Sequence, residues 1–426
     1  MLSALKNRDY RLLWIGQSIS HLGDQFHLVA LPWLVLTLTK DPLQLGLVMA
    51  AAGIPRAGLM LLGGAWADRF SPRGIMLVSD LGRFALTAAL AVAIVSGQAQ
   101  LWMVYVLAIS FGVVSGFFLP AAEAALPRLV RSAELESGNS LMMGADQLAT
   151  FVGPVVAGVL IATFGGASAG GQSVAALLGI GVAFGADALS FLVSAATLVL
   201  LRPLPGLGSR DTHPLAAVAE GVRFVVRDRM LLTLLTFITF ANLCVTGPLL
   251  VGVPVVASTR LSEGAAAFGV IVSAYGLGNL LGMLACGALP RMSDRMFGVF
   301  SAVLFVAFGA VVALLGVLTN TWVIAALMVA LGVGNGYIAV LVMTALQRLA
   351  PKAMLGRVMS LAMLSMYGLM PISMALTGAL LKFSVQTAFF AAGAGLLVIS
   401  VFAFAQRGMW SFPAEAPVAE AMPEPA

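Results

Sequence analysis

Long apolar stretches, separated by short polar connections, follow one another along almost the whole chain. Each of twelve such stretches has at least about 20 residues, the length that an α-helix needs to cross the hydrocarbon core of a bilayer. The pattern predicts transmembrane helices over 11–38, 44–67, 74–97, 101–126, 138–164, 174–201, 229–257, 264–289, 296–318, 322–346, 357–382 and 385–406. We therefore expect an all-α polytopic membrane protein with twelve transmembrane helices.

Composition excludes several other classes of protein. Of the 426 residues, 60% are hydrophobic and only 10% are charged, whereas soluble domains carry roughly 25% charged residues. An ordinary soluble enzyme or nucleic-acid-binding protein is therefore excluded. Both cysteines lie inside apolar stretches, so we expect them to be small buried side chains rather than a disulfide framework. The first apolar stretch lacks the cleavage site of a removable signal and is expected to be a span.

Apart from Arg56 and Arg83, which lie inside predicted spans, the 23 Lys and Arg residues are unequally divided between the two sides of the predicted membrane. Eighteen lie in the N-terminus, in the even-numbered connections or after the last span. Three lie on the opposite side, namely Lys40, Arg260 and Lys382. Because cytoplasmic loops are enriched in Lys and Arg, we expect a multi-pass protein of the plasma (inner) membrane with both termini in the cytoplasm. The net charge of +5 has the same explanation.

An internal repeat relates the two ends of the chain. Three glycines recur 223 residues later: Gly46, Gly53 and Gly64 match Gly269, Gly276 and Gly287. The segment 111–116 likewise matches 331–336 at an offset of 220. Parallel repeats of this kind are typical of transporters built from two related halves. The alternative is that glycine-rich helices match by chance.

The repeat divides the chain into two six-helix halves, residues 1–201 and 229–407. The connection between them, 202–228, begins as a loop rich in Pro and Gly. Over 214–227 it places apolar and charged residues at helical spacing, which predicts an amphipathic helix on the membrane surface. The tail, 408–426, is rich in Pro, Ala and Glu and is expected to be disordered.

A short motif occupies the connection between the second and third spans. Gly64 is followed by Asp68 and Arg69 and then by a further basic residue, Arg73. This pattern resembles the signature loop of the major facilitator superfamily. The resemblance implies a two-half helical fold and a conformational latch, in which Asp68 faces Arg357 at the start of the eleventh span. A basic loop that only fixes the topology is the alternative.

A second motif lies in the fifth span, where Gly153, Pro154 and Gly158 follow one another. These residues resemble the glycine–proline motif of antiporters in the same superfamily. Gly and Pro together permit a bend and a close approach of helices, which suits a rocking motion of the two halves. A packing kink without any role in the motion is the alternative. No charged residue lies between Tyr105 and Phe118, where such exporters often carry an arginine.

Ionisable side chains inside predicted spans are costly to insert and are therefore candidates for function. In the first span, Gln17, His21 and Asp24 lie within about 60° of one another around the helix. They predict a polar stripe that faces a water-filled cavity. The candidates for proton coupling are Asp24, Asp146 in the fifth span and Glu123 near the cytoplasmic end of the fourth. For Glu123, an interfacial pair with a nearby arginine is the alternative.

Two arginines, Arg56 and Arg83, also lie inside predicted spans. Arg83 follows Asp80 by three residues, so the two are expected to pair on one helix face. The depths of Arg56 and Asp24 in the membrane differ by only about 3 Å. We therefore expect these two side chains to interact in at least one conformation. A static pair that only fixes helix packing is the alternative.

The candidates for lining a substrate cavity are polar or charged residues of both halves. They are Gln17, His21, Arg56, Asn242, Tyr275, Asn279 and Asn335. His21, Asp24 and His27 share a side of the first helix and offer ligands for a metal. Ligands from other helices are not evident, so no metal is expected. The chain has no phosphate-binding loop and none of the common hydrolase motifs, so we expect neither a cofactor nor enzymatic activity.

The segments 126–139, 187–192 and 220–225 are similar to one branch of the superfamily, which holds the enterobactin exporter and the macrolide efflux proteins. This resemblance implies secondary active efflux of amphipathic small molecules, drug-like or siderophore-like, in exchange for protons and by alternating access. The expected partners are the substrate, protons and the lipid bilayer, without nucleic acid, and a monomer is the expected functional form. An importer or facilitator of a metabolite, a lipid-moving relative, and a non-transporting scaffold or receptor are the alternatives.

Overall fold

The computed structural model describes residues 4–69, 71–131, 134–165, 174–204, 214–288, 294–349 and 354–405. Within these ranges it leaves out the side chains of residues 60–69, 174–176, 214–219, 294–302, 348, 355, 356 and 403–405. The tail predicted over 408–426 lies outside the described residues.

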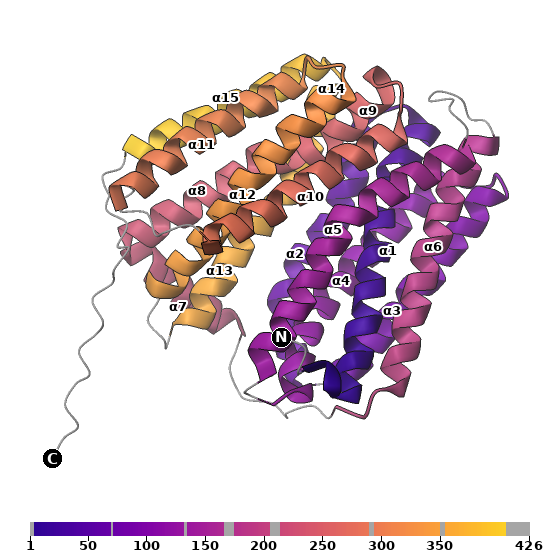
Figure 1. The fold of residues 1–426 in the computed structure, drawn as a ribbon, viewed down its shortest axis with the longest axis horizontal. Helices are drawn as coiled ribbons and strands as arrows, with labels where there is room; N and C mark the ends of the chain where they lie inside the picture. The colour runs from indigo at the N-terminus through magenta and orange to yellow at the C-terminus, as the bar shows by residue number, and fades with distance from the viewer. Residues whose placement is uncertain are drawn as a thin grey trace.

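Six long helices form an N-terminal group (Figure 1). They are α1 (Arg8–Thr39), α2 (Pro42–Arg69), α3 (Pro72–Val95), α4 (Leu101–Leu129), α5 (Leu135–Gly165) and α6 (Val174–Leu200). Local chemistry sets their ends. The Asn7 side chain accepts hydrogen bonds from two backbone amides of the first turn of α1, and α1 ends at Lys40, whose φ is 52°. Ser71 caps α3 in the same way, with Pro72 in the first helical position.

The connecting helix and the C-terminal group follow. They are α7 (Pro214–Arg227), α8 (Arg229–Gly247), α9 (Val253–Arg260), α10 (Ala265–Ala288), α11 (Asp294–Leu315), α12 (Thr321–Leu349), α13 (Leu355–Tyr367), α14 (Met370–Leu381) and α15 (Val385–Ala405). Two predicted spans are interrupted. A π-helical turn (Pro248–Gly252) joins α8 to α9, and Gly368 separates α13 from α14 shortly before Pro371. Pro248 and Pro371 lack the backbone N–H donor of a regular helix and lie where the regular hydrogen bonding changes.

The helices agree with the predicted spans in position. Among the described residues, nine helical segments are long and apolar enough to cross a membrane, judged by length and composition. Each of the twelve predicted spans coincides with one helix or with consecutive helices, and no strand occurs in the described ranges. The prediction of an all-α polytopic membrane protein is confirmed.

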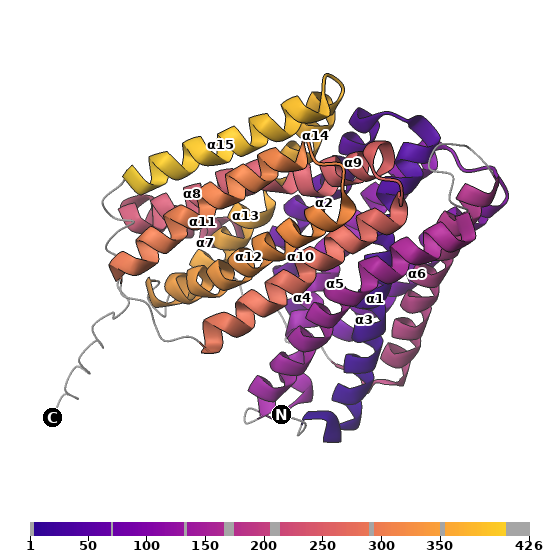
Figure 2. The ribbon, with the colours of Figure 1, turned by 45° about the horizontal axis from the view of Figure 1, so that its top comes forward.

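The two groups of helices lie side by side and meet mainly through two pairs of helices, α2 with α14 and α5 with α10. They are closest near α9 and α14 and spread apart towards the end at which the N-terminus lies (Figures 1 and 2). The largest buried apolar cluster includes residues of both groups, among them Leu45, Phe268 and Met374. In the part of the chain that the structure describes, the shared core of the two groups therefore lies towards one end.

Repeated glycines make these two contacts. A Cβ atom on Gly46 of α2 would lie 3.0 Å from the Cα of Gly378 in α14. The matching glycine, Gly269 of α10, faces α5 at Gly158, where a Cβ atom would lie 3.1 Å from the Cα of Gly269. Because only glycine permits backbones to approach so closely, the internal repeat corresponds to two equivalent interfaces between the groups.

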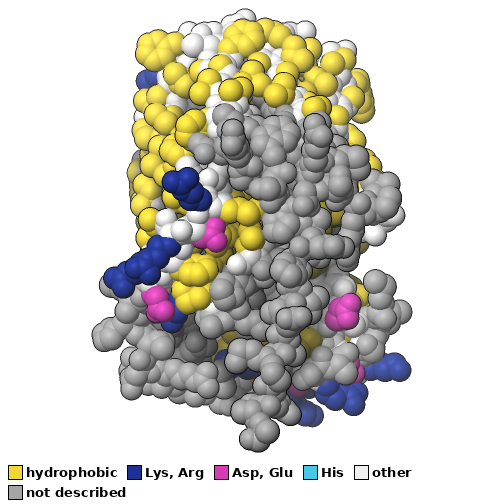
Figure 3. Space-filling model, turned by 90° about the vertical axis from the view of Figure 1, so that its left-hand side faces the viewer, with side chains coloured by type: hydrophobic (Ala, Val, Ile, Leu, Met, Phe, Trp, Pro, Cys, Tyr) yellow, Lys and Arg dark blue, Asp and Glu magenta, His cyan; other side chains and the backbone are white. Residues whose placement is uncertain are grey.

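Charged side chains are distributed unevenly between the two ends of the molecule. On the face shown in Figure 3 they gather mainly in the lower half, the end at which the N-terminus lies in Figure 1. At the opposite end, the Nζ of Lys382 lies 3.3 Å from a carboxylate oxygen of Asp41, which joins the two groups. At that end too, the Thr321 hydroxyl donates a hydrogen bond of 2.7 Å to Glu263 and lowers the pKa of its carboxyl.

Candidate functional site

A chain of polar side chains connects α1 to α5 and α3. The Nδ1 atom of His21 lies 3.9 Å from a carboxylate oxygen of Asp24 on the same helix and 3.7 Å from one of Asp146 on α5. The other oxygen of Asp24 lies 3.9 Å from a guanidinium nitrogen of Arg83 on α3. The structure therefore brings together two of the three predicted proton-coupling residues, with His21 between them.

Arg83 anchors the buried end of this chain. Its guanidinium lies 3.1 Å from an oxygen of Asp80, so the predicted pair within α3 is confirmed. The guanidinium also lies over the ring of Phe118, 4.0 Å from its centroid, and 4.8 Å from that of Phe191. Rings and a carboxylate are the partners that a desolvated arginine needs.

Asp80 is fully buried and links α3 to α6 and α1. It accepts a hydrogen bond of 2.6 Å from the Ser194 hydroxyl, and the Gln17 amide donates one of 3.3 Å to the same hydroxyl. Gln17 is buried at 2% exposure and ends the polar chain. In this conformation Gln17 lines neither of the cavities described below, because the amide is used inside the N-terminal group.

Exposure and charge change along the chain of contacts. The side chains of Asp24 and Asp146 are 38% and 47% exposed, whereas those of Arg83 and Asp80 are 5% and 0% exposed. Three carboxylates share one guanidinium and one imidazole. The polar chain thus holds more carboxylates than cations, and it runs from exposed to buried side chains. A carboxylate in such a chain can bind and release a proton.

A second buried pair joins α1 to α6. The Nδ1 atom of His27 lies 3.3 Å from Asp187, which is fully buried, and the imidazole stacks on Phe111 with 4.4 Å between ring centroids. One oxygen of Asp187 has no hydrogen-bond partner among the residues that the structure describes. His27 thus faces α6, and the described residues contain no cluster of three or more potential metal ligands. The partners lie 160 positions apart, so spacing along the chain could not pair them.

The third candidate for proton coupling, Glu123, lies apart from this polar chain. Its side chain on α4 is exposed, and it forms no ion pair with any described residue. The predicted interfacial pair with a nearby arginine is therefore not seen in the described part of the chain.

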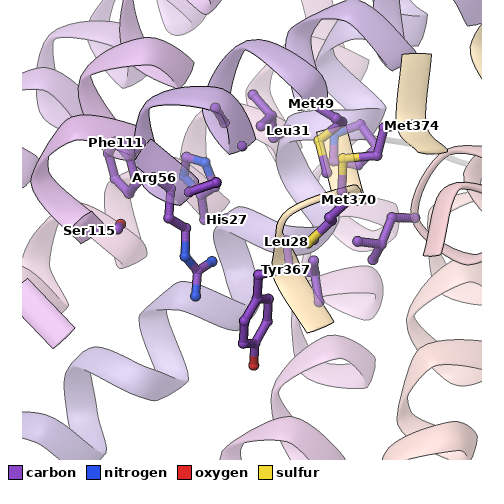
Figure 4. Close-up of a pocket in the computed structure, with 16 residues that line it drawn as sticks. His27, Leu28, Leu31, Met49, Arg56, Phe111, Ser115, Tyr367, Met370 and Met374 are labelled. Atoms are coloured by element: carbon purple, nitrogen blue, oxygen red, sulfur yellow. The ribbon is translucent and has the colours of Figure 1, made fainter. Parts of the chain in front are cut away.

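A cavity of about 190 Å³ lies between the two groups of helices (Figure 4). Its lining includes His27, Met49, Arg56, Phe111, Ser115, Tyr367, Met370 and Met374. The carbon at the centre of the Arg56 guanidinium lies 5.5 Å from the centroid of the Tyr367 ring. In this conformation Asp24 lies beside Arg83, and Arg56 forms no ion pair with Asp24, so their interaction in another conformation stays a prediction.

A second cavity, of about 280 Å³, lies within the C-terminal group. Its lining includes Phe237, Asn242, Phe305, Phe308, Asn335 and Tyr367. Tyr367 therefore lines both cavities. The Asn335 amide donates a hydrogen bond of 2.9 Å to Asn279, which lies behind it on α10. Of the predicted cavity residues, Arg56, Asn242 and Asn335 line a cavity, whereas Gln17, His21, Tyr275 and Asn279 line neither of these two.

The residues of the predicted latch lie in separate contacts. The side chains of Gly64, Asp68 and Arg69 are outside the described residues. The Arg73 guanidinium donates hydrogen bonds of 2.7 and 2.9 Å to the carbonyls of Leu198 and Val199 at the end of α6. Arg357 lies 2.7 Å from Glu220 of α7. In this conformation Arg73 therefore holds α3 to α6, and Arg357 holds the connecting helix to α13.

The motif of the fifth span has two faces. Gly153 packs against Gln25 of α1, inside the N-terminal group. Its other face meets α10, where the carbonyl of Pro154 faces Gly269 and Gly158 faces the backbone of Ala265. The motif therefore lies at a contact between the two groups, where a close approach of backbones is required.

The sequence matches the model of the Major Facilitator Superfamily over residues 13–372 and 264–421. The multidrug efflux pump Tap of Mycolicibacterium fortuitum is 28% identical over 371 residues, which cover 84% of this chain and 85% of that protein. The enterobactin exporter EntS of Shigella flexneri is 26% identical over 362 residues, which cover 84% of this chain and 81% of that protein. The MFS-type transporter YfiS of Bacillus subtilis is 31% identical over 227 residues, or 52% of this chain and 50% of that protein.

Solved structures share the fold. A bacterial homologue of the iron transporter ferroportin in an inward-facing state has a TM-score of 0.69 at 20% identity, with 95% of this chain and 99% of that chain covered. A POT family transporter has a TM-score of 0.73 at 12% identity, with 93% and 95% covered. Identities this low establish the arrangement of helices alone.

Proposed function

This chain belongs to the major facilitator superfamily, and we propose that it is a secondary active transporter that exports amphipathic small molecules in exchange for protons. The observation that carries the proposal is the polar chain from Asp146 through His21 and Asp24 to Arg83. Ionisable residues inside a membrane are retained where ions or protons move. The similarity to a multidrug efflux pump and an exporter supports the outward direction.

Alternating access would proceed by rocking of residues 1–201 against residues 229–407, with 202–228 as the linker. Close glycine contacts and the pair of Lys382 with Asp41 join the groups at one end, so this conformation is closed there. We assign that end to the outside and the end carrying the N-terminus to the cytoplasm of the plasma (inner) membrane, in agreement with the distribution of basic residues. A monomer suffices, because both halves of the site lie in one chain.

Proton coupling would act through the charge around Arg83. In this conformation Arg83 contacts both Asp80 and Asp24. A proton bound at Asp24 or at Asp146 removes one of three carboxylate charges and weakens the hold of Asp24 on Arg83. Since these residues come from α1, α3 and α5, a change in their attraction alters how the helices of the N-terminal group pack against one another.

The latch would form in the opposite conformation. The pair of Arg357 with Glu220 seen here holds α7 to α13. We propose that closure of the cytoplasmic side brings the loop of Asp68 to the start of α13, where Arg357 is its partner.

Reconstituted proteoliposomes test the proposal directly. With an acidic lumen, at least one member of a panel of fluorescent amphipathic compounds should accumulate above its external concentration, because protons leaving the lumen drive entry of the compound. Nigericin, which collapses the pH gradient, should abolish the accumulation. Accumulation driven by an acidic exterior would indicate an importer, and equilibration that ignores the gradient would indicate a facilitator; either result contradicts the proposal.

Gly158→Ala should impair the cycle. A methyl group there would lie 2.5 Å from the carbonyl oxygen of Ala265 and 3.1 Å from the Cα of Gly269, so α5 and α10 could not close as they do here. Overpacking costs about 1–3 kcal/mol, which corresponds to roughly a tenfold loss of the closed state. Initial rates of uptake should fall by about that factor. Gly144→Ala, on the same helix with open space around its Cβ position, is the control and should transport at the wild-type rate.

A further inference from the structure

Arg56 has no ionic partner in the part of the chain that the structure describes. Its Nε atom is inaccessible and has no hydrogen-bond acceptor among the described residues, none of which places a carboxylate within ion-pair distance of the guanidinium. The ring of Tyr367 offers only a cation–π contact at 5.5 Å. A charged side chain in the middle of a membrane-spanning helix needs a partner of opposite charge or water. Since no described residue provides such a partner, a molecule bound in the cavity can provide it.

The other polar groups near Arg56 do not supply a negative charge. His27 lines the same cavity, but its Nδ1 atom faces Asp187. Asp187 is fully buried and is absent from the cavity lining. Ser115 and Tyr367 contribute hydroxyl groups, which can donate hydrogen bonds to an anion. Among the described residues that line the cavity, the polar side chains are thus those of Arg56, His27, Ser115 and Tyr367, and none of them is a carboxylate.

The rest of the space is apolar and aromatic. Met49, Met370 and Met374 line the cavity beside Arg56, and methionine adapts to apolar groups of many shapes. The adjoining cavity, which shares Tyr367, is lined by Phe237, Phe305 and Phe308. Figure 4 shows Arg56 and Tyr367 side by side, with Met370 next to Tyr367 and with Met49 and Met374 above and to the right of them. The two cavities together suit a molecule with a charged end and an apolar body.

We infer that the cavity at Arg56 binds the anionic group of an amphipathic substrate, such as a carboxylate, a sulfonate or a phosphate. The inference deepens the proposed function by naming a substrate class, and it rests on that function for the role of the cavity in transport. Arg56 comes from α2 and Tyr367 from α13, so a bound anion contacts both halves of the protein. An anionic lipid headgroup has the same chemistry and is a second source of such a ligand.

The test compares two fluorescent probes that differ in charge alone: dansylglycine, which is anionic, and dansylglycinamide, which is neutral. The protein is held in nanodiscs of phosphatidylcholine, and dissociation constants are measured by fluorescence titration without any gradient. Wild type should bind dansylglycine at least about tenfold more tightly than dansylglycinamide, as expected for charge-assisted hydrogen bonds. Arg56→Gln should reduce this ratio to about one, and Arg56→Lys should retain part of it.

Arg8→Gln is the control, because Arg8 is exposed at the start of α1 and pairs only with Asp9 among the described residues; it should leave the ratio unchanged. Binding of dansylglycinamide by Arg56→Gln shows that this variant is folded. Nanodiscs that contain phosphatidylglycerol identify the source: displacement of dansylglycine assigns the site to a lipid headgroup, and unchanged binding assigns it to a small anion.

Equal affinities of wild type for the two probes, no binding of either probe, or an unchanged ratio in Arg56→Gln would overturn the inference. Failure of the proposed function is distinguished from these results, because it concerns gradient-driven accumulation, whereas the probe titration requires only a binding site.

Discussion

Asp24→Asn is expected to abolish the accumulation of substrate driven by a pH gradient while leaving exchange of substrate across the membrane intact. The amide matches the carboxylate in size and still contacts His21 and Arg83, but it cannot bind and release a proton. Uphill accumulation should fall to the background of empty vesicles. Counterflow of labelled substrate into vesicles preloaded with unlabelled substrate should proceed within about twofold of the wild-type rate, because binding and rocking are retained.

Asp9→Asn is the matched control for this substitution. Asp9 lies on the same helix, in its first turn, and contacts Arg8 and Arg202 outside the polar chain. It should accumulate substrate as the wild type does. If Asp24→Asn still drives uphill accumulation with the wild-type dependence on pH, then coupling resides in another group, and Asp146 becomes the residue to exchange.

Arg83→Gln is expected to have the largest effect on stability. The side chain of Arg83 is 5% exposed. It is the only described cation within ion-pair distance of Asp80, which is fully buried. Breaking a buried ion pair at one partner costs about 3–5 kcal/mol, because the other charge remains in a medium of low dielectric constant. The midpoint of thermal unfolding in detergent should fall by many degrees.

The double variant Asp80→Asn/Arg83→Gln distinguishes the contribution of the two charges to stability from the contribution of side-chain packing. Because the double variant has neither charge, most of the stability lost in Arg83→Gln should return. Proton-coupled accumulation should be absent from both variants, because Asp24 has lost the contact with Arg83. Additive losses of stability in the two single variants and the double variant would show that Asp80 and Arg83 do not stabilise each other.

The positions of the helices could be predicted from the sequence because hydropathy over about 20 residues is a local property. The interruptions within two spans were missed. The break at Gly368 and the π-helical turn at Pro248 lie inside apolar stretches, where hydropathy does not change. Proline and glycine lie at both interruptions, but a proline inside a membrane helix often causes no break, as Pro32 in α1 and Pro154 in α5 show.

The matching glycines of the repeat were predicted to reflect two related halves, and the structure gives a physical reason for them. Gly46 and Gly269 face the opposite group at equivalent places, as do Gly53, which meets Pro371, and Gly276, which meets Thr150. Gly287 has open space around its Cβ position, so the third match has no such reason.

The candidate site could be predicted only where its partners lie on one helix. Asp80 and Arg83 are three residues apart, and helical geometry pairs them. The prediction of Arg56 as the partner of Asp24 rests on their similar depth in the membrane. Two residues at the same depth on neighbouring helices can still point in different directions. The contact between Asp24 and Arg83 depends on how α1 and α3 are rotated about their axes, and tertiary packing alone determines that rotation.

The central claim is that the movement of substrate and the movement of protons are coupled in opposite directions through Asp24. The measurement that tests it most directly is the pH inside proteoliposomes loaded with pyranine, recorded while a transported compound is added outside. Entry of the compound in exchange for protons should raise the lumenal pH in wild-type vesicles, and vesicles with Asp24→Asn should take up the compound without any change of pH. A fall of lumenal pH in the wild type, or uptake of the compound by the wild type at constant pH, would contradict the account.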